Sequence, residues 1–166
     1  MKLFYRKYGE GPPLMILHGL YGSSDNWISV AKSISKMFTV YLPDLRNHGL
    51  SPHNNLHDYD SLGSDIYELV NELNIRKFFL AGHSMGGKTA INFTLKWPEL
   101  IEGLLIADIS PFQTTNFRSD EYYQSKEILE TILETDVSAS SSRNHVEMLL
   151  TQKITSAKVR GLIRVC

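Results

Sequence analysis

The sequence predicts an α/β fold in which a mostly parallel sheet carries helices on both faces. Strand-like and helix-like segments alternate along residues 1–110, which is typical of parallel strands joined by helices. The strand-like segments are unbroken apolar runs, as expected for strands that are covered on both faces. The chain has 166 residues, 42% of them hydrophobic and 21% charged, a composition ordinary for a globular domain.

Five segments are predicted to be strands. The first, Leu3–Tyr8, ends in a turn rich in glycine and proline and is expected at an edge of the sheet. The other four are short apolar runs: Leu14–Leu17, Phe38–Leu42, Phe78–Ala81 and Leu104–Ala107. Helical periodicity fills the gaps between them. Its apolar positions are Trp27, Ala31 and Ile34; then Leu62, Ile66, Leu69, Val70 and Leu73; then Ala90, Phe93 and Trp97, with Pro98 closing the last helix.

The alternation stops after Pro111. One amphipathic helix is predicted over Asp120–Thr135, and a capping box of Asn144 and Glu147 predicts the start of a second. No strand separates these two helices, so they are interpreted as an insertion over the sheet. We therefore predict a core over residues 1–110 and an incomplete helical lid over residues 111–166.

The segment from Gly82 to Gly87 carries the clearest chemical signal. Ser84 lies in a G-x-S-x-G pattern directly after the Phe78–Ala81 strand. This pattern is the nucleophile elbow of α/β-hydrolases, a strained strand-to-helix turn that exposes the serine hydroxyl. The N–H of Met85 is then expected to be one donor to the oxyanion. His83 and Gly86 are expected to support the turn.

A second loop, His18-Gly19-Leu20-Tyr21-Gly22, follows the Leu14–Leu17 strand. In the same fold the second donor of the oxyanion hole comes from this position, so we predict that it is the N–H of Leu20. His18 and Gly19 are expected to shape the loop. We do not assign His18 as the catalytic base, because the base of such enzymes follows the serine in the chain.

A rival pattern covers part of the same segment. Residues 82–89 also match G-x-x-x-x-G-K-[ST], the phosphate-binding P-loop, and Asp108 could then hold magnesium. Three features disfavour it. The motif follows the third strand–helix unit, only one helix separates Lys88 from the Asp108 strand, and the His-Gly loop is left unexplained. Lys88 and Thr89 are better interpreted as the start of a helix.

Two further loops make the assignment more specific. Asp44-Leu45-Arg46-Asn47-His48-Gly49-Leu50-Ser51 follows the second parallel strand, and Ile106-Ala107-Asp108-Ile109-Ser110-Pro111 closes the fourth. With the elbow and the His-Gly loop, they resemble the small bacterial YbfF-type esterases of the α/β-hydrolase superfamily, from about Leu3 into the 150s. For Asp44, Arg46 and His48 we expect a structural role in holding their loop.

The resemblance implies a chemistry. Ser84 would be the nucleophile, and Asp108 would orient and stabilise the catalytic histidine, although a strand-end aspartate that caps a turn is the alternative. Members of the family act on acyl esters and acyl-CoA thioesters without a metal or an organic cofactor. A non-catalytic, hydrolase-like binding module is the alternative function.

The chain departs from the family in one respect. The family's catalytic histidine lies in a loop after the last strand of a longer domain, whereas here only His145 follows Asp108. His145 is expected at the start of a lid helix without the partner that a triad base needs, so we favour a surface role for it. Our hypothesis is a truncated copy with impaired activity. Its Leu104–Ala107 strand would become an exposed edge through which the chain could self-associate.

Composition excludes several other classes. A net charge of −1 gives no long-range attraction to nucleic acid. No run approaches the roughly 20 apolar residues of a membrane span, and the first residues lack the apolar core of a signal peptide. Cys166 is the single cysteine, so an internal disulfide is excluded, which suits a cytoplasmic location.

Overall fold

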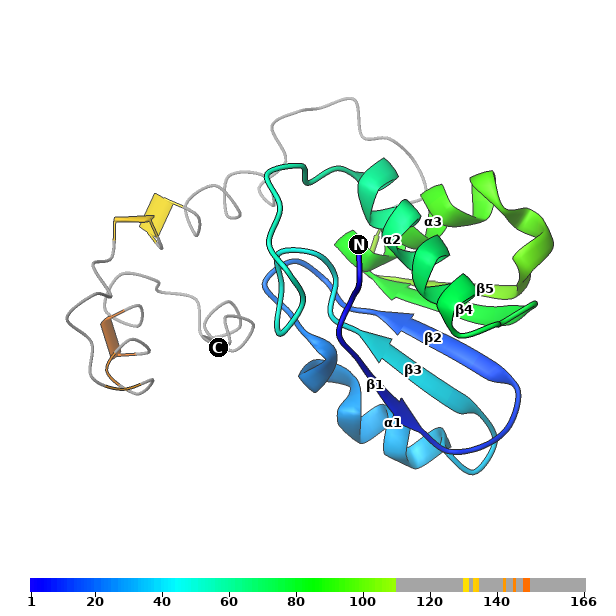
Figure 1. Ribbon diagram of the computed structural model, residues 1–166. Coiled ribbons are helices and arrows are strands. Elements are labelled where there is room, and N and C mark those ends of the chain that lie inside the picture. The colour runs from blue at the N-terminus through cyan, green and yellow to red at the C-terminus, as the bar shows by residue number, and fades with distance from the viewer. Residues whose placement is uncertain (110–129, 132, 135–141, 143–144, 146–147, 150–166) are drawn as a thin grey trace. The chain divides into compact units, whose positions relative to one another are not determined.

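The computed structural model describes residues 1–109 together with residues 130, 131, 133, 134, 142, 145, 148 and 149 (Figure 1). The chain divides into two compact units, Met1–Ile109 and Ser110–Cys166. Apart from the isolated positions just named, the lid helices predicted within residues 111–166 lie outside the described residues.

The first unit contains five strands, three α-helices and two short 3-10 helices. In chain order they are β1 (Tyr5–Tyr8), β2 (Pro13–Leu17), η1 (Ser24–Trp27), α1 (Ile28–Ile34), β3 (Thr39–Pro43), α2 (Tyr59–Glu72), β4 (Phe78–His83), α3 (Met85–Lys96), η2 (Pro98–Leu100) and β5 (Ile101–Ala107). Every strand and helix predicted in this region is present. The strand bounds differ from the prediction by one to three residues, the largest difference being at the start of β5.

The strands form one sheet in the order β1-β3-β2-β4-β5 (Figure 1). Only β1 is antiparallel to its neighbour, and β3, β2, β4 and β5 are parallel. The prediction of a mostly parallel sheet is therefore confirmed. Because parallel strands end at the same edge, the loops after β2, β3, β4 and β5 all meet there.

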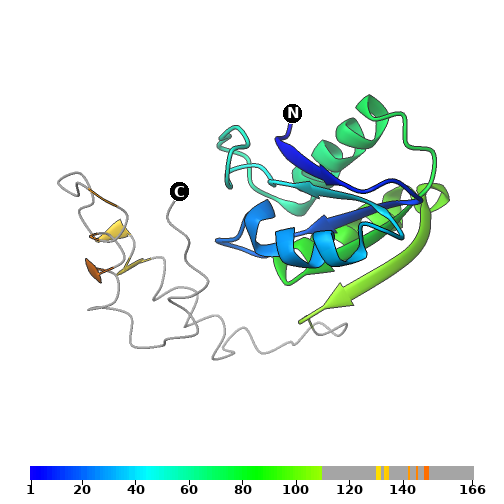
Figure 2. The ribbon, with the colours of Figure 1, turned by 90° about the horizontal axis from the view of Figure 1, so that it is seen from below.

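Helices cover the two faces of this sheet unequally. On one face α2 and α3 pack with Met15 and Leu17 of β2 in the larger core cluster. The alternate β2 residue Ile16 belongs to a smaller cluster on the other face, which contains Ala31 of α1. Figure 2 shows α1 in front of β2 and β3, whereas β5 lies clear of that helix.

The helix ends follow from local sequence. The Asp58 side chain caps α2 by accepting the Ser61 N–H at 2.7 Å. Helix α3 ends at Lys96, and Pro98 begins η2. Proline has no backbone N–H with which to continue the hydrogen bonds of α3. Among the described residues, no helix combines the length and apolar character needed to cross a membrane.

Candidate functional site

The turn between β4 and α3 is strained at Ser84. Its backbone takes φ 52° and ψ −117°, a conformation that residues other than glycine rarely adopt. The Ser84 N–H donates to the Ala107 carbonyl at 3.0 Å, and the Ser84 carbonyl accepts the Lys88 N–H at 3.0 Å. The first hydrogen bond joins the turn to the end of β5, and the second is the first hydrogen bond of α3. The serine thus lies at a sharp junction that is held from both sides.

Glycines allow the start of α3 to approach two strands. A Cβ atom at Gly82 would lie 2.3 Å from the Gly86 carbonyl oxygen, which is closer than any side chain tolerates. A Cβ atom at Gly86 would lie 2.5 Å from the carbonyl oxygens of Leu17 and His18. The first turn of α3 is therefore packed directly against the end of β2. This contact brings the elbow to the His-Gly loop.

His18 connects the loops after β2 and β3. The Leu45 N–H donates to its Nε2 at 3.0 Å, so Nδ1 carries the proton and donates to the Gly19 carbonyl at 2.8 Å. The ring is almost entirely buried, and burial lowers the pKa of His18 from 6.5 to about 4. Both ring nitrogens are engaged by backbone groups. Neither is free to accept a proton from Ser84.

The loop that was predicted to complete the oxyanion hole lies beside the elbow. A Cβ atom on Gly19 would lie 2.8 Å from His83 Nδ1 and 3.3 Å from Ser84 Cβ. The Gly22 N–H closes the turn on the Gly19 carbonyl at 3.1 Å, with Tyr21 at a positive φ of 62°. Glycine at position 19 is what lets the loop touch the serine. The structure therefore brings the two predicted donor segments together.

The donors themselves can be located on those segments. Met85 is the first residue of α3, and the first N–H groups of a helix have no partner within the helix. Leu20 lies in the loop that contacts Ser84 and is partly exposed. Their N–H groups as oxyanion donors remain a prediction.

Asp108 follows β5 at the same edge of the sheet. Its Oδ2 lies 3.2 Å from Nε2 of His83, and its side chain is 79% exposed. The His83 ring also contacts the Trp27 ring edge-on at a centroid distance of 6.3 Å. The sequence analysis did not pair Asp108 with His83. The parallel register, which places His83 opposite Ala107, is the feature that brings them together.

The loop after β3 is held by buried polar contacts. Asp44 accepts the Ser24 N–H at 2.6 Å and the Leu50 N–H at 2.8 Å, and it is 2% exposed. Arg46 forms two hydrogen bonds to Asp65, at 2.6 and 2.8 Å. The expected ion pair and hydrogen bonds of this loop are thus present.

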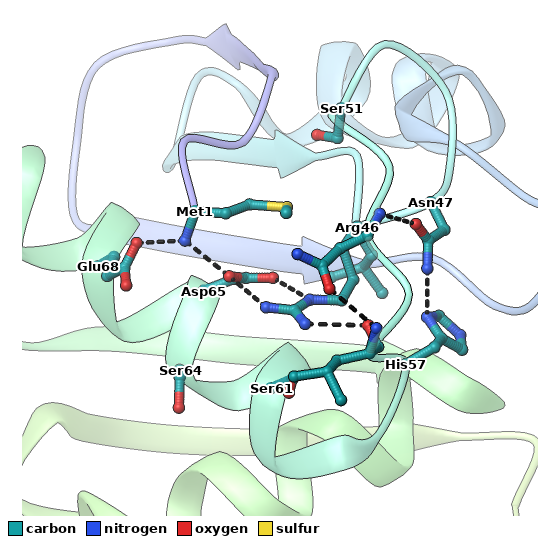
Figure 3. Close-up of polar contacts among 12 residues, drawn as sticks. Met1, Arg46, Asn47, Ser51, His57, Ser61, Ser64, Asp65 and Glu68 are labelled. Atoms are coloured by element: carbon teal, nitrogen blue, oxygen red, sulfur yellow. Dashed lines mark hydrogen bonds and ion pairs between the residues drawn. The ribbon is translucent and has the colours of Figure 1, made fainter.

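Asp65, which Figure 3 shows between Met1 and Arg46, was not predicted from the sequence. It lies on the buried face of α2 between Leu62 and Ile66, and an acidic residue on an otherwise apolar face was the available signal. The amino group of Met1 also contacts Asp65 Oδ1 at 2.8 Å, and Figure 3 shows this amine reaching Glu68 as well. Asp65 therefore joins α2 to both the Arg46 loop and the first residue.

The rival P-loop pattern does not fit the observed geometry. The Thr89 side chain is completely buried, and its hydroxyl donates to the Met85 carbonyl inside α3 at 3.0 Å. A P-loop threonine needs that hydroxyl for magnesium. In the part of the chain that the structure describes, no cluster of three histidine, cysteine or acidic side chains could hold a metal ion.

His145 belongs to the second unit. Its N–H donates to the Ser142 carbonyl at 3.1 Å, and the residue is partly buried. The surface role of His145 stays a prediction.

Comparisons with known proteins agree with the predicted fold. A family model described as alpha/beta hydrolase fold matches residues 12–145. The sn-1-specific diacylglycerol lipase ABHD11 of Danio rerio is 40% identical over 163 residues, which cover 93% of this chain and 49% of the relative. Esterase YbfF of Escherichia coli (strain K12) is 33% identical over 111 residues, covering 67% of this chain and 44% of the relative.

Among solved structures, one titled "Marine microorganism esterase" superposes with a TM-score of 0.90 at 42% identity. The match covers 98% of this chain and 62% of that chain. The predicted resemblance to YbfF-type esterases and the predicted fold are both confirmed. The chain spans about half the length of the curated relatives that it matches.

Proposed function

We propose that this chain, which belongs to the alpha/beta hydrolase fold family, carries the nucleophile of a serine hydrolase acting on carboxylic esters or thioesters of acyl substrates. The observation that supports this most is the strained backbone of Ser84, at φ 52° and ψ −117° between β4 and α3. Such strain persists only where the surrounding structure enforces it, and it is typical of functional positions. The names of the relatives, esterases and a lipase among them, point to the same substrate class.

The mechanism follows from the groups around this serine. Ser84 Oγ would attack the acyl carbonyl while a base accepts the hydroxyl proton and later passes it to the leaving alcohol or thiol. The N–H groups of Leu20 and Met85 would donate to the oxyanion of the tetrahedral intermediate. Water would then attack the acyl-enzyme and release the acid. Asp108 would orient the imidazole that serves as the base.

The base is the component that residues 1–109 do not visibly supply. Within this described unit, no histidine hydrogen-bonds to Ser84 Oγ, His18 is engaged by backbone on both nitrogens, and His83 contacts Asp108. Removing the base from a Ser-His-Asp triad leaves roughly 10³- to 10⁴-fold acceleration over water from the oxyanion hole and binding. We therefore propose weak esterase activity for this chain by itself.

Labelling with a fluorophosphonate probe tests the nucleophile. Phosphonylation of Ser84 Oγ with loss of fluoride should be found by peptide mass spectrometry, and it should vanish in Ser84→Ala. Ser29→Ala is a matched control, because Ser29 is an exposed serine on α1. Labelling that persists in Ser84→Ala would contradict the proposal.

One observation favours a second candidate function, a hydrolase-like module that binds acyl compounds without cleaving them. In the described unit, the carboxylate of Asp108 contacts His83 and not a histidine that hydrogen-bonds to Ser84 Oγ. Saturable binding of an acyl ester by a folded sample, without turnover and without fluorophosphonate labelling, would favour this module over the enzyme.

A further inference from the structure

His83 is held by contacts from three other segments. It is the last residue of β4 and directly precedes Ser84. Its Nε2 lies 3.2 Å from Asp108 Oδ2 at the end of β5, and its ring contacts the Trp27 ring of η1 edge-on. The third contact is with Gly19 of the His-Gly loop. The side chain is 31% exposed, so its position is fixed while solvent can still reach it.

The contact with Asp108 decides which ring nitrogen carries the proton. A carboxylate oxygen accepts hydrogen bonds and donates none, so the N–H of the neutral His83 ring is at Nε2. Nδ1 then keeps its lone pair and is the basic nitrogen. Within residues 1–109, no donor hydrogen-bonds to this Nδ1. His83 therefore has one nitrogen on a carboxylate and the other available for a proton.

Nδ1 lies close to the serine. A Cβ atom at Gly19 would be 2.8 Å from His83 Nδ1 and 3.3 Å from Ser84 Cβ, so both atoms border the same point. Nδ1 is the ring atom nearest to that point, and glycine leaves the space there open. A general base can accept a proton directly or through one water molecule. The separation of Nδ1 from the serine suits transfer through one water.

His18 provides the contrast. Both of its ring nitrogens are engaged by backbone groups, and its ring is almost entirely buried. His83 has the opposite arrangement, because a carboxylate holds Nε2 and would stabilise the imidazolium that forms when Nδ1 takes up a proton. Of the two histidines nearest the elbow, His83 is the one built to accept a proton.

We propose that His83, oriented by Asp108, is the general base for Ser84 in this chain, a role that rests on the proposed function. As Ser84 Oγ attacks the acyl carbonyl, its proton passes through one water molecule to His83 Nδ1. The imidazolium is stabilised by the Asp108 carboxylate. The proton then returns by the same route to the alcohol or thiol, which leaves as the bond to the acyl carbon breaks.

The rate of fluorophosphonate labelling of the full chain tests this base. Labelling joins Ser84 Oγ to phosphorus, expels fluoride and releases the hydroxyl proton. His83→Gln keeps a side-chain N–H that can reach Asp108 but has no basic nitrogen. Because general bases contribute about 10²- to 10⁴-fold, we expect this variant to react roughly a hundredfold more slowly. The parent rate should rise from about pH 5 to pH 8, where imidazoles lose their proton, and the variant should lose that rise.

Two matched variants and a rescue separate a proton acceptor from a structural residue. His53→Gln changes an exposed histidine, and His145→Gln changes the histidine of the second unit; both should react at the parent rate. His83→Ala should recover labelling when free imidazole is added, because imidazole can take the place of the missing ring. Circular dichroism and thermal melting will show that all the variants are folded.

Equal rates in His83→Gln and the parent would overturn this role for His83 but leave the proposed function intact, because Ser84 would still be labelled. A loss in His145→Gln in place of His83→Gln would assign the base to the second unit. Slow labelling of His83→Ala that imidazole does not restore would make the role of His83 structural. Absence of labelling at Ser84 in the parent would contradict the proposed function itself, and the role of His83 with it.

Discussion

The loop after β3 and the turn after β5 lie at the same edge of the sheet but are held in opposite ways. Asp44, in the first, is 2% exposed and accepts two backbone N–H groups. Asp108, in the second, is 79% exposed and has a 3.2 Å contact with His83. The first carboxylate fixes a backbone, whereas the second is accessible to a partner. The difference separates a structural aspartate from a candidate catalytic one.

The elements around β2 and β3 differ from those around β5 in the same way. Around β2 and β3, buried ion pairs and hydrogen bonds tie each loop to a neighbouring element. Around β5, by contrast, the side chains of Leu104 and Leu105 are exposed among the described residues. The half of the site nearest β2 and β3 is therefore held by buried polar contacts within this unit, whereas β5 keeps exposed apolar side chains among the described residues. Substitutions in the two regions, and a change of pH, test this comparison.

Arg46→Met should destabilise the chain the most. It leaves the buried Asp65 carboxylate with the Met1 ammonium as its remaining cation, and breaking a buried pair typically costs about 3–5 kcal/mol. Arg6→Met is the control, because the Arg6–Asp25 pair is partly exposed and its loss should cost less than about 1 kcal/mol. Urea unfolding followed by circular dichroism measures both. Similar losses would contradict the contrast between buried and exposed pairs.

Acid should destabilise the fold through His18. Its folded pKa is about 4, below the unfolded value of 6.5, so the unfolded chain binds this proton more readily. The stability that neutral His18 contributes is fully present above pH 6.5. It is lost as the pH falls toward 4, and the loss from His18 is roughly 3 kcal/mol. Urea midpoints between pH 7 and pH 4.5 measure the slope. It should flatten in His18→Asn and persist in His53→Asn, which changes an exposed histidine.

Replacing each of the two aspartates by asparagine compares them directly. Asp44→Asn removes one of the two acceptor oxygens that the Ser24 and Leu50 N–H groups use, and should cost about 1–3 kcal/mol. Asp108→Asn should change the free energy of unfolding by less than about 0.5 kcal/mol, because the residue is exposed and asparagine tolerates its positive φ of 59°. Thermal melts of the two variants measure the difference. A large loss in Asp108→Asn would make its role structural.

Ser84→Gly should stabilise the chain slightly. Glycine adopts the backbone of the elbow without the steric cost of a Cβ atom, so a gain of about 1 kcal/mol is expected, while fluorophosphonate labelling is lost. Ser29→Gly should do the reverse and cost about 0.5 kcal/mol, because it places glycine in α1. Destabilisation by Ser84→Gly would mean that the turn is not strained.

Much of the fold and part of the site could be predicted from local sequence. Apolar runs located β2, β3, β4 and β5, because a strand covered on both faces needs apolar residues at every position. The glycines around Ser84 predicted the elbow, because a Cβ atom at Gly82 would lie 2.3 Å from the Gly86 carbonyl oxygen and only glycine avoids that clash. By contrast, Asp65 and the contact between His83 and Asp108 were not predicted. Each joins residues at least 19 positions apart, and their meeting depends on how helices pack and strands align.

The sequence by itself therefore determined the order of the elements, the strained serine turn and the His-Gly loop beside it. These features follow from the conformational limits of a few neighbouring residues. The tertiary structure alone decided which aspartate is buried beneath Arg46, which one is exposed near Ser84 and, among the described residues, which strand keeps exposed apolar side chains. Those outcomes follow from packing between distant segments, where burial and partner geometry set the roles that residue type alone leaves open.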